Sequence, residues 1–413
     1  MPSISPARPI AIAICLLLCL LDLGLGVETG YPGLLALTVA GAVLLYPYRY
    51  TSPGAVMLLT GASIYVVPYM SLLFIREPVN LSWLALFNIV CFAMLASTTR
   101  DHGMAEPARP RIETSVLVNL LAMVTILTLG LGVIALRPED TTSGPFYLAT
   151  WGLALLPLER LHWSASRFVH LAASGVFVLF ILVYAVFVWT GEGRIVVLSL
   201  VLAPVLLTSL YRTFRVDGLL LAGAGMFMVF FGRVLRFGWS GGLAGVAEDS
   251  GATHILMSSQ LWRETNEAFP ITNFWEQYLL YFLNWIPRNA WPGKPLGVNY
   301  TFVDVYIGRK GLGEEFSTAL GYFGEHIFYS RSFWLFMVVA VTLTTIYVRK
   351  AIGRLAGNYI GPVIIFDVWL ITLFWGGMAV FASRIWFSIV PLLLVSWLIR
   401  SGPRNPQLVA EPA

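Results

Sequence analysis

Long apolar runs, separated by short polar segments, follow one another along most of this chain. Most of them approach the roughly 20 residues that an α-helix needs to cross the hydrocarbon core of a bilayer. The pattern predicts an all-α integral membrane protein with about 12 transmembrane helices. The sixth run is short and the ninth is marginal, so these two are expected to be tilted, broken or extended into their flanks. The runs are residues 9–26, 31–48, 54–75, 79–98, 114–136, 145–158, 168–190, 194–211, 217–232, 331–348, 360–381 and 384–399.

One long polar-rich interval interrupts this pattern between the ninth and tenth runs. It covers residues 233–330 and separates an N-terminal membrane part, 1–232, from a C-terminal one, 331–413, which ends in a short tail. Within the interval, residues 273–286 are rich in aromatic side chains but too short and polar to span, which suits a helix lying at the membrane surface. Residues 313–329 are predicted to form a second such helix that dips back towards the membrane.

Composition supports the membrane assignment. The chain has 413 residues, of which 58% are hydrophobic and 12% charged, whereas about 25% of residues are charged in a typical soluble domain. A soluble fold cannot bury that much apolar surface. The formal net charge of +4 is small, so the placement of the charges carries more information than their sum.

The cations are distributed unevenly between alternate connections. Cytoplasmic loops of membrane proteins carry an excess of Lys and Arg, and an internal N-terminus puts every strongly basic short connection inside. The short external loops then carry one cation each at most, namely Arg76, Arg137 and Arg194. An even number of spans returns the C-terminus to the cytoplasm and places the 233–330 loop outside. The predicted internal cations are Arg8, Arg49, Arg100, Arg109, Arg111, Arg160, Arg167, Arg212, Arg215, Arg349, Lys350, Arg354, Arg400 and Arg404.

Several kinds of site have no sequence signal. No glycine-rich phosphate loop precedes a Lys-Ser or Lys-Thr pair, and no His, Cys, Asp or Glu cluster has the spacing of metal ligands. No Asp-x-Asp motif is present, and nucleotide sugars belong to the cytoplasm rather than to the external side. We therefore expect chemistry without a metal, a cofactor or a nucleotide-sugar donor.

The most distinctive polar stretch is residues 285–295, Trp-Ile-Pro-Arg-Asn-Ala-Trp-Pro-Gly-Lys-Pro. Its three prolines exclude an ordinary helix or strand interior. The stretch is predicted to form a stiff, aromatic-packed loop that presents the fixed charges of Arg288 and Lys294 on the external side.

Three further arginines are predicted at the same face. Arg194 follows Gly191 and Gly193 at the outer end of a span, and Arg331 and Arg384 are predicted to begin the tenth and twelfth spans. Arginine keeps its charge and binds phosphate oxygens in a bidentate manner, so these residues together with Arg288 could cradle a diphosphate. The alternative is that cations at span ends only anchor the protein to lipid headgroups.

Candidate acid–base residues lie in the external loop. His326 follows Glu325 directly, and His254 lies earlier in the loop; a histidine can accept a proton from a sugar hydroxyl. Asp304, with Glu314 and Glu315, forms a rival set, because burial can raise the pKa of a carboxyl group into the working range. The alternative for either histidine is a structural, hydrogen-bonded role.

One acid falls inside a predicted span. Asp367 is about a turn and a half from the cytoplasmic end of the eleventh span, so its carboxylate is expected to reach water. An intramembrane acid is otherwise an indication of function, above all of transport.

A family resemblance rests on the proline stretch. Ile-Pro-Arg-Asn-Ala-Trp-Pro-Gly-Lys-Pro at residues 286–295 resembles the Ile-Pro-Arg-x-x-Trp-Pro-x-Lys-Pro signature of bacterial oligosaccharide repeat-unit polymerases, the Wzy group. Gly193 and Arg194 resemble a pair at an external span start in that group and in the related O-antigen ligases, with Glu192 standing where the longer Gly-x-Arg form has glycine. Residues 319–324, Ala-Leu-Gly-Tyr-Phe-Gly, are similar to the re-entrant segment that follows the signature.

The resemblance implies a GT-C-like membrane glycosyltransferase of the bacterial inner membrane that needs no metal or other cofactor. Its donor would be a glycan on undecaprenyl diphosphate and its acceptor one repeat unit on the same lipid, polymerised at the periplasmic face into O-antigen or exopolysaccharide. Arg288 and Arg194 would contact the diphosphate with Lys294 in support, and His326 or Glu325 would lie near the acceptor. A flippase and a chain-length regulator of the same pathway would be partners, and nucleic acid would not.

Two other functions are consistent with the sequence. A ligase would pass a finished chain to another acceptor by the same chemistry, and the sequence does not separate it from a polymerase. A transporter or flippase for lipid-linked glycans would also have about 12 spans. It would depend on intramembrane charges such as Asp367, and the cations in the middle of spans are few.

Overall fold

The computed structural model describes residues 114–136, 143–188, 194–210, 274–306, 320–330, 333–357 and 359–401. All regular secondary structure in these ranges is helical. Four helical stretches in the described part are long and apolar enough to cross a membrane, which supports the predicted all-α membrane protein. They are Val116–Leu136, Arg167–Phe187, Phe336–Ala356 and Gly361–Ile399. The predicted spans between residues 9 and 98, and the one at 217–232, lie outside the described ranges.

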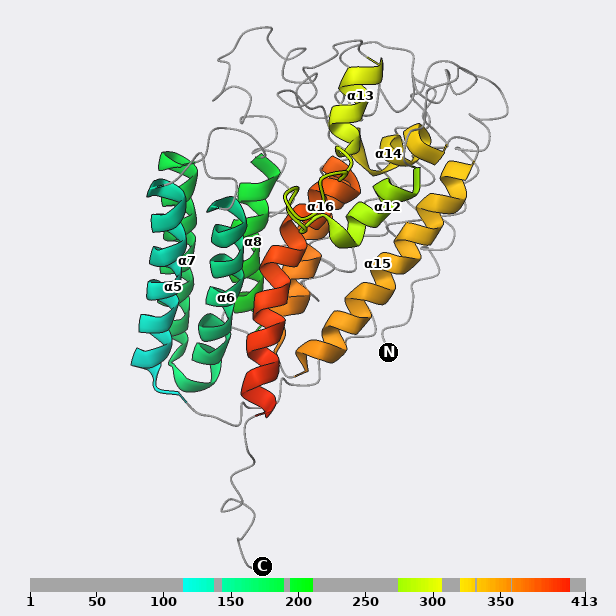
Figure 1. Ribbon diagram of the computed structural model, residues 1–413. Coiled ribbons are helices and arrows are strands. Elements are labelled where there is room, and N and C mark those ends of the chain that lie inside the picture. Colours follow the sequence, from blue (N-terminus) through cyan, green and yellow to red (C-terminus); the bar gives the residue numbers. More distant parts are fainter. Residues whose placement is uncertain are drawn as a thin grey trace, which may run out of the picture.

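Four helices from the N-terminal membrane part stand side by side (Figure 1). They are α5 (Val116–Leu136), α6 (Ser143–Ser164), α7 (Arg167–Phe187) and α8 (Arg194–Leu210). Three of them match the predicted runs closely. The short run at 145–158 extends into its flanks, which is one of the expected outcomes: α6 has 22 residues, because the helix continues through Pro157 and a polar last turn that hydropathy alone does not count as part of a span.

The second group contains the short helices α12 (Phe274–Leu283), α13 (Val298–Tyr306) and α14 (Gly321–Ser330), and the long helices α15 (Trp334–Ala356) and α16 (Gly361–Ser401). The three short helices gather at one end of the bundle, where α15 begins (Figure 1). α12 corresponds to the predicted surface helix at 273–286. α14 covers the last part of the predicted helix at 313–329, whose earlier residues lie outside the described ranges.

α16 is two helices folded back on each other at Gly377. This residue has φ 81° and ψ −176°, a backbone conformation that interrupts the helix. The rings of Phe366 and Phe381 are 5.7 Å apart, and a Cβ on Gly361 would lie 3.6 Å from Leu392, whereas a straight helix would separate that second pair by about 46 Å. The two arms therefore correspond to the predicted spans at 360–381 and 384–399, but the turn comes several residues earlier than predicted.

The α16 hairpin packs closely against α6. A Cβ on Gly152 would lie 3.0 Å from the carbonyl carbon of Ser388, so only glycine allows the two backbones to approach this closely. On the other arm, the rings of Trp151 and Trp369 meet edge to face at 5.8 Å. The hairpin is thus held between α6 on one side and the short helices on the other.

A buried glutamate on α6 caps the first arm of the hairpin. The two carboxylate oxygens of Glu159 accept hydrogen bonds from the backbone N–H groups of Ile360, at 2.6 Å, and Gly361, at 3.0 Å. A carboxylate at a helix N-terminus satisfies donors that have no partner in the helix and is favoured by the helix dipole. This role was not predicted from the sequence.

Asp367 does not reach water, contrary to the expectation from its position. It is 2% exposed and forms a bidentate ion pair with Arg349 of α15, with distances of 2.6 Å from Nε to Oδ1 and 2.8 Å from Nη2 to Oδ2. The physical reason is that α15 packs against the first arm of α16 and brings the guanidinium to the carboxylate, so that neither charge has to face solvent or lipid alone.

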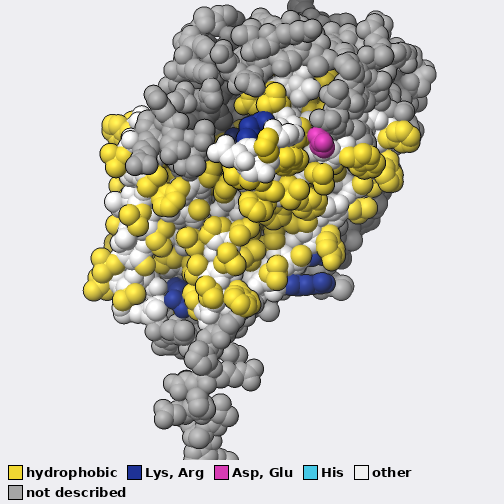
Figure 2. Space-filling model, viewed as in Figure 1, with side chains coloured by type: hydrophobic (Ala, Val, Ile, Leu, Met, Phe, Trp, Pro, Cys, Tyr) yellow, Lys and Arg dark blue, Asp and Glu magenta, His cyan; other side chains and the backbone are white. Residues whose placement is uncertain are grey.

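The cations separate towards the two ends of the bundle. The cationic side chains gather in patches near both ends of the visible face (Figure 2). Arg288 and Lys294 belong to the end formed by α12, whereas Lys350 and Arg354 belong to the last turns of α15, at the opposite end. Of the predicted cations that the structure describes, these external and internal ones thus lie at opposite ends, as the charge rule requires; which end faces the cytoplasm stays a prediction.

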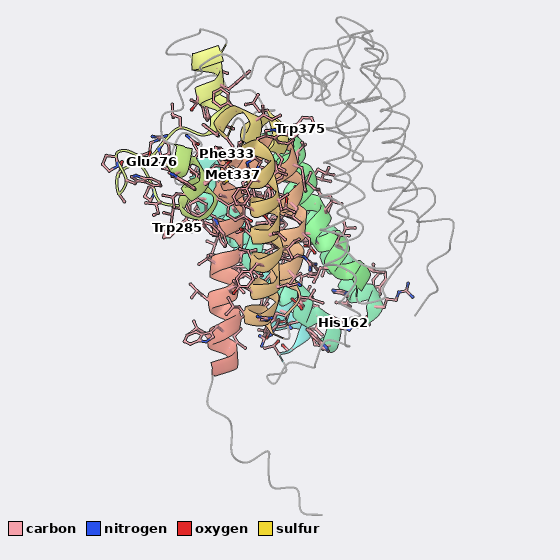
Figure 3. The ribbon with its side chains drawn as sticks, turned by 90° about the vertical axis from the view of Figure 1, so that its right-hand side faces the viewer. His162, Glu276, Trp285, Phe333, Met337 and Trp375 are labelled. Carbon is pink, nitrogen blue, oxygen red and sulfur yellow. The ribbon has the colours of Figure 1, made fainter. Side chains whose placement is uncertain are left out.

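The α12 end also carries exposed aromatic side chains. Trp275, Phe282 and Trp285 are 70%, 42% and 48% exposed, and Phe333 and Phe336 at the start of α15 are each 69% exposed. Trp285 and Phe333 lie near this end in Figure 3, and His162 lies at the other. Aromatic side chains gather where a membrane meets water, which agrees with the prediction that this end lies at such an interface.

Candidate functional site

The predicted proline loop is a compact series of turns between α12 and α13. We call residues 284–297 the cationic loop. Its backbone closes three successive turns, with hydrogen bonds from the N–H of Ile286 to the carbonyl of Leu283, from Trp291 to Pro287, and from Lys294 to Trp291. Proline supplies fixed φ angles here, so the loop is stiff without being helical.

The two cations of the loop donate hydrogen bonds to the loop's own backbone carbonyls. Lys294 Nζ donates to the carbonyls of Asn284, at 2.5 Å, and Ile286, at 2.8 Å. Arg288 Nη1 donates to the carbonyl of Lys294 at 2.7 Å. Partial burial, and next the charge of Arg288, lower the pKa of Lys294. Arg288 Nη2 also donates to the carbonyl of Pro295 at 3.5 Å, so the guanidinium shapes the loop although the residue itself is exposed.

The cationic loop is attached to the turn of the α16 hairpin. Asn284 Nδ2 donates to the carbonyl of Ala379 at 2.6 Å, and Trp386 Nε1 donates to the carbonyl of Tyr281 at 2.8 Å. The loop is therefore attached to the second arm of the hairpin, directly at Ala379 next to the turn and, by way of Tyr281 in α12, at Trp386. This matters because a binding group acts only as well as its support is rigid.

Glu325 of α14 lies in the break of the hairpin. Its Oε2 accepts from the backbone N–H of Met378 at 2.6 Å, so it caps the second arm as Glu159 caps the first. The residue is 1% exposed. Burial raises the pKa of Glu325 to about 8, against the smaller opposing effect of the Met378 hydrogen bond. A Cβ on Gly377 would lie 2.8 Å from Glu325 Cδ.

This burial makes the stability of the protein depend on pH through Glu325. The folded pKa of Glu325 is raised. Between pH 4.5 and about 8, the folded state therefore holds a proton that the unfolded state has already lost. Stability from this group is fully present below that window and declines through it. We expect the difference in free energy of unfolding, wild type minus Glu325→Gln, to decrease as pH rises through the window, measured by denaturation in detergent micelles. A difference that stays constant with pH would contradict the assignment.

His326 is also buried, on the other side of α14. Its Nδ1 is 2.9 Å from the hydroxyl of Tyr278, and that hydroxyl also hydrogen-bonds to Ser330. The edge of the His326 ring meets Tyr322 at 4.6 Å. Nε2 has no hydrogen-bond partner within the described part of the chain. Burial lowers the pKa of His326 to about 3, so the imidazole is neutral at ordinary pH.

The structure brings part of the predicted site together through one chain of contacts. Glu325 binds Met378, the next residue Ala379 binds Asn284, and Asn284 binds Lys294. The acidic and cationic parts thus meet at the hairpin turn, but they differ in access, because Glu325 and His326 are buried whereas the loop is not.

For the remaining predicted site residues, the structure gives the helix position of some and does not describe the others. Arg384 was predicted at the start of a span but lies on the second arm of the hairpin, which begins at Met378, because the turn is early. Arg194 begins α8 and Asp304 lies in α13; their side chains are outside the described part. Arg331 and the acid–base candidates His254, Glu314 and Glu315 fall outside the described ranges.

Sequence reasoning missed several residues that build this site. Tyr278, Asn284 and Gly377 have no role in the sequence prediction, although the pair Gly376–Gly377 inside an apolar run is a signal for a break. Within the described ranges, no group of three or more His, Cys, Asp or Glu side chains is arranged to hold a metal ion. Comparison with protein-family models, curated proteins and solved structures found no match to this chain.

Proposed function

We propose that this protein is a membrane glycosyltransferase that polymerises oligosaccharide repeat units carried on undecaprenyl diphosphate, working at the periplasmic face of a bacterial inner membrane. The observation that supports this proposal most is the cationic loop. The loop carries the resemblance to repeat-unit polymerases, and it is hydrogen-bonded to the turn of a membrane helix hairpin. Exposed Arg288 lies there, at an end of the bundle that carries exposed aromatic side chains.

The proposed reaction needs little from acids and bases. The acceptor hydroxyl oxygen attacks the anomeric carbon of the donor glycan, the bond from that carbon to the diphosphate breaks, and undecaprenyl diphosphate leaves with the bonding electron pair. The hydroxyl proton passes to a base or to water. Diphosphate is already a good leaving group, so stabilising its growing charge matters most, and fixed cations do so without reorganising. Arg288 and Arg194 are proposed for this task, with Lys294 in support.

The buried pair has a different place in this proposal. Glu325 and His326 remain candidates near the acceptor, yet both are closed off in this structure, at 1% and 0% exposure. The ion pair of Asp367 with Arg349 weakens the transport alternative, because the acid on which transport would depend is already neutralised.

A reconstituted polymerisation assay tests the proposal. Purified protein incubated with lipid-linked repeat units should produce a ladder on a gel, and the Arg288→Ala, Arg194→Ala double variant should lose at least about 100-fold in rate, since removal of charged transition-state contacts costs roughly 3 kcal/mol or more. Arg354→Ala, at the opposite end of the bundle, is the matched control and should retain activity. A ladder made equally well by the double variant would refute the assigned roles.

Other products would support the rival functions. Transfer of a preformed chain to a separate acceptor, without elongation, would assign the protein to the ligases. Movement of lipid-linked glycan across a vesicle membrane that depends on Asp367 and not on Arg288 would assign it to the transporters.

A further inference from the structure

One side of α12 carries exposed apolar side chains. Leu279 and Phe282 are 46% and 42% exposed, whereas Tyr281 on the other side of the helix is 2% exposed. Residues three and four apart share a helix face, so Trp275, at 70% exposure, extends the exposed side by one turn towards the start of the helix. Trp285, in the turn that follows the helix, is also exposed. We call these four exposed side chains the α12 stripe.

The buried side of α12 packs on membrane-spanning helices, so this helix lies beside them and not beyond their ends (Figure 1). The hydroxyl of Tyr281 is 2.9 Å from Thr345 Oγ1, and Thr345 lies well inside the apolar stretch Phe336–Ala356. The carbonyl of Tyr281 accepts from Trp386, which lies inside the stretch Gly361–Ile399. The surroundings of such stretches are lipid hydrocarbon. The α12 stripe, on the opposite side of the same helix, therefore faces lipid.

The α12 stripe ends close to the exposed cation of the cationic loop. Arg288 follows Trp285 by three residues, and three residues span at most about 11 Å. The hydrogen bonds of Arg288 to the carbonyls of Lys294 and Pro295 use two of its five N–H groups. The guanidinium can therefore still bind an anion. An exposed apolar surface that adjoins such a cation complements a lipid with a hydrocarbon chain and an anionic head.

We propose that the α12 stripe binds the isoprenoid chain of the lipid-linked substrate while the cationic loop holds its diphosphate. The inference rests on the proposed function, which supplies this lipid. The ester bond keeps the first isoprene units beside the phosphate, and the α12 stripe is the exposed apolar surface that the polypeptide joins directly to the loop. Three of its four side chains are aromatic, and aromatic rings offer a large apolar contact area to a hydrocarbon chain.

Photocrosslinking of the full-length protein in nanodiscs of neutral lipid tests this assignment. The probe is undecaprenyl diphosphate with a diazirine on an isoprene unit near the phosphate, and mass spectrometry locates the labelled residues. The internal control is α7, which stands apart from the cationic loop (Figure 1) and whose Leu179 and Leu182 are 57% and 48% exposed. The label on residues 275–285 should exceed the label on these two leucines at least about fivefold, because only α12 adjoins the site that holds the diphosphate.

Three variants separate the contributions of the apolar surface and the cation. Leu279→Ala combined with Phe282→Ala should lower the label on α12 about fivefold, because two of the side chains that contact the isoprenoid chain are shortened. Arg288→Gln should lower it as well, because the diphosphate no longer holds the chain beside the helix. The matched control, Leu179→Ala combined with Leu182→Ala, should leave the label on α12 within about twofold of wild type.

Equal labelling of α12 and α7 in the wild-type protein would overturn the proposal, and this result needs no variant to fold. An unchanged label on α12 in Arg288→Gln would overturn the link between the stripe and the loop. Excess unlabelled undecaprenyl diphosphate should displace the label from α12. Equal displacement by phosphatidic acid, which presents a phosphate on acyl chains, would assign the surface to phospholipid instead. Preferential labelling in a protein that builds no ladder would keep the chain-binding surface and remove the polymerase, and a ladder without preferential labelling would do the reverse.

Discussion

Gly377→Ala should destabilise the protein by about 2–6 kcal/mol, because two separate costs fall on one residue. The backbone there has φ 81° with ψ −176°, a region that only glycine occupies without strain. The new methyl group would also lie 2.8 Å from Glu325 Cδ, so the buried carboxyl group that caps the second arm would be displaced. Chemical denaturation in detergent, followed by tryptophan fluorescence, measures the effect.

The matched control is another glycine in a membrane helix. Gly175 lies within α7, and an added Cβ there meets no atom within 4 Å. Gly175→Ala should leave stability unchanged or raise it by up to about 1 kcal/mol, because alanine has the higher helix propensity. Equal stability of Gly377→Ala and wild type would mean that the hairpin turn does not need this backbone conformation. Adding Glu325→Ala to Gly377→Ala should recover only the part of the loss that comes from the steric clash.

Asp367→Asn should cost about 3–5 kcal/mol, the second large effect that the structure predicts. The substitution keeps the size of the side chain but leaves the charge of Arg349, which is 4% exposed, buried without its partner. The penalty comes mainly from this uncompensated charge rather than from the loss of one hydrogen bond. The same denaturation measurement applies.

A double variant separates the two contributions. Arg349→Met combined with Asp367→Leu removes both charges and should be much closer to wild type than either single change, because no buried ion then remains unpaired. Arg354→Ala, an exposed position on the last turn of the same helix, should change stability by less than about 0.5 kcal/mol. If Asp367→Asn were as mild as this control, the ion pair would not be the contact that joins α15 to α16.

Prediction from sequence succeeded where a property is local. The runs at 114–136, 168–190 and 194–211 match the bounds of α5, α7 and α8, because the length of an apolar run is a local property of the sequence. It left the ends of α6 open, expecting tilt, a break or extension, and it failed at the hairpin turn; at both places tertiary contacts extend or interrupt the helix. The polar last turn of α6 is kept helical, and its Glu159 is buried at 1% exposure against the start of α16.

The candidate site shows the same division. The cationic loop could be recognised because prolines and cations adjacent in sequence shape it. The burial of Glu325 and His326 could not, since exposure depends on which helix covers them. Likewise the place of Arg384 within the second arm, rather than at its start, follows from the turn at Gly377 and not from the length of an apolar run.

The sequence by itself therefore determined the membrane class, the two-sided distribution of cations and the stiff cationic loop, because hydropathy, charge and proline act over neighbouring residues. Only the tertiary structure decided that two glutamates cap the two arms of one hairpin. Their partners are 201 and 53 residues away, and no local pattern encodes which buried carboxylate will meet which unpaired helix end. The tertiary structure also decided that the cationic loop is attached at the turn of that hairpin. Tertiary packing, rather than the local sequence, therefore sets the positions of the loop's charges.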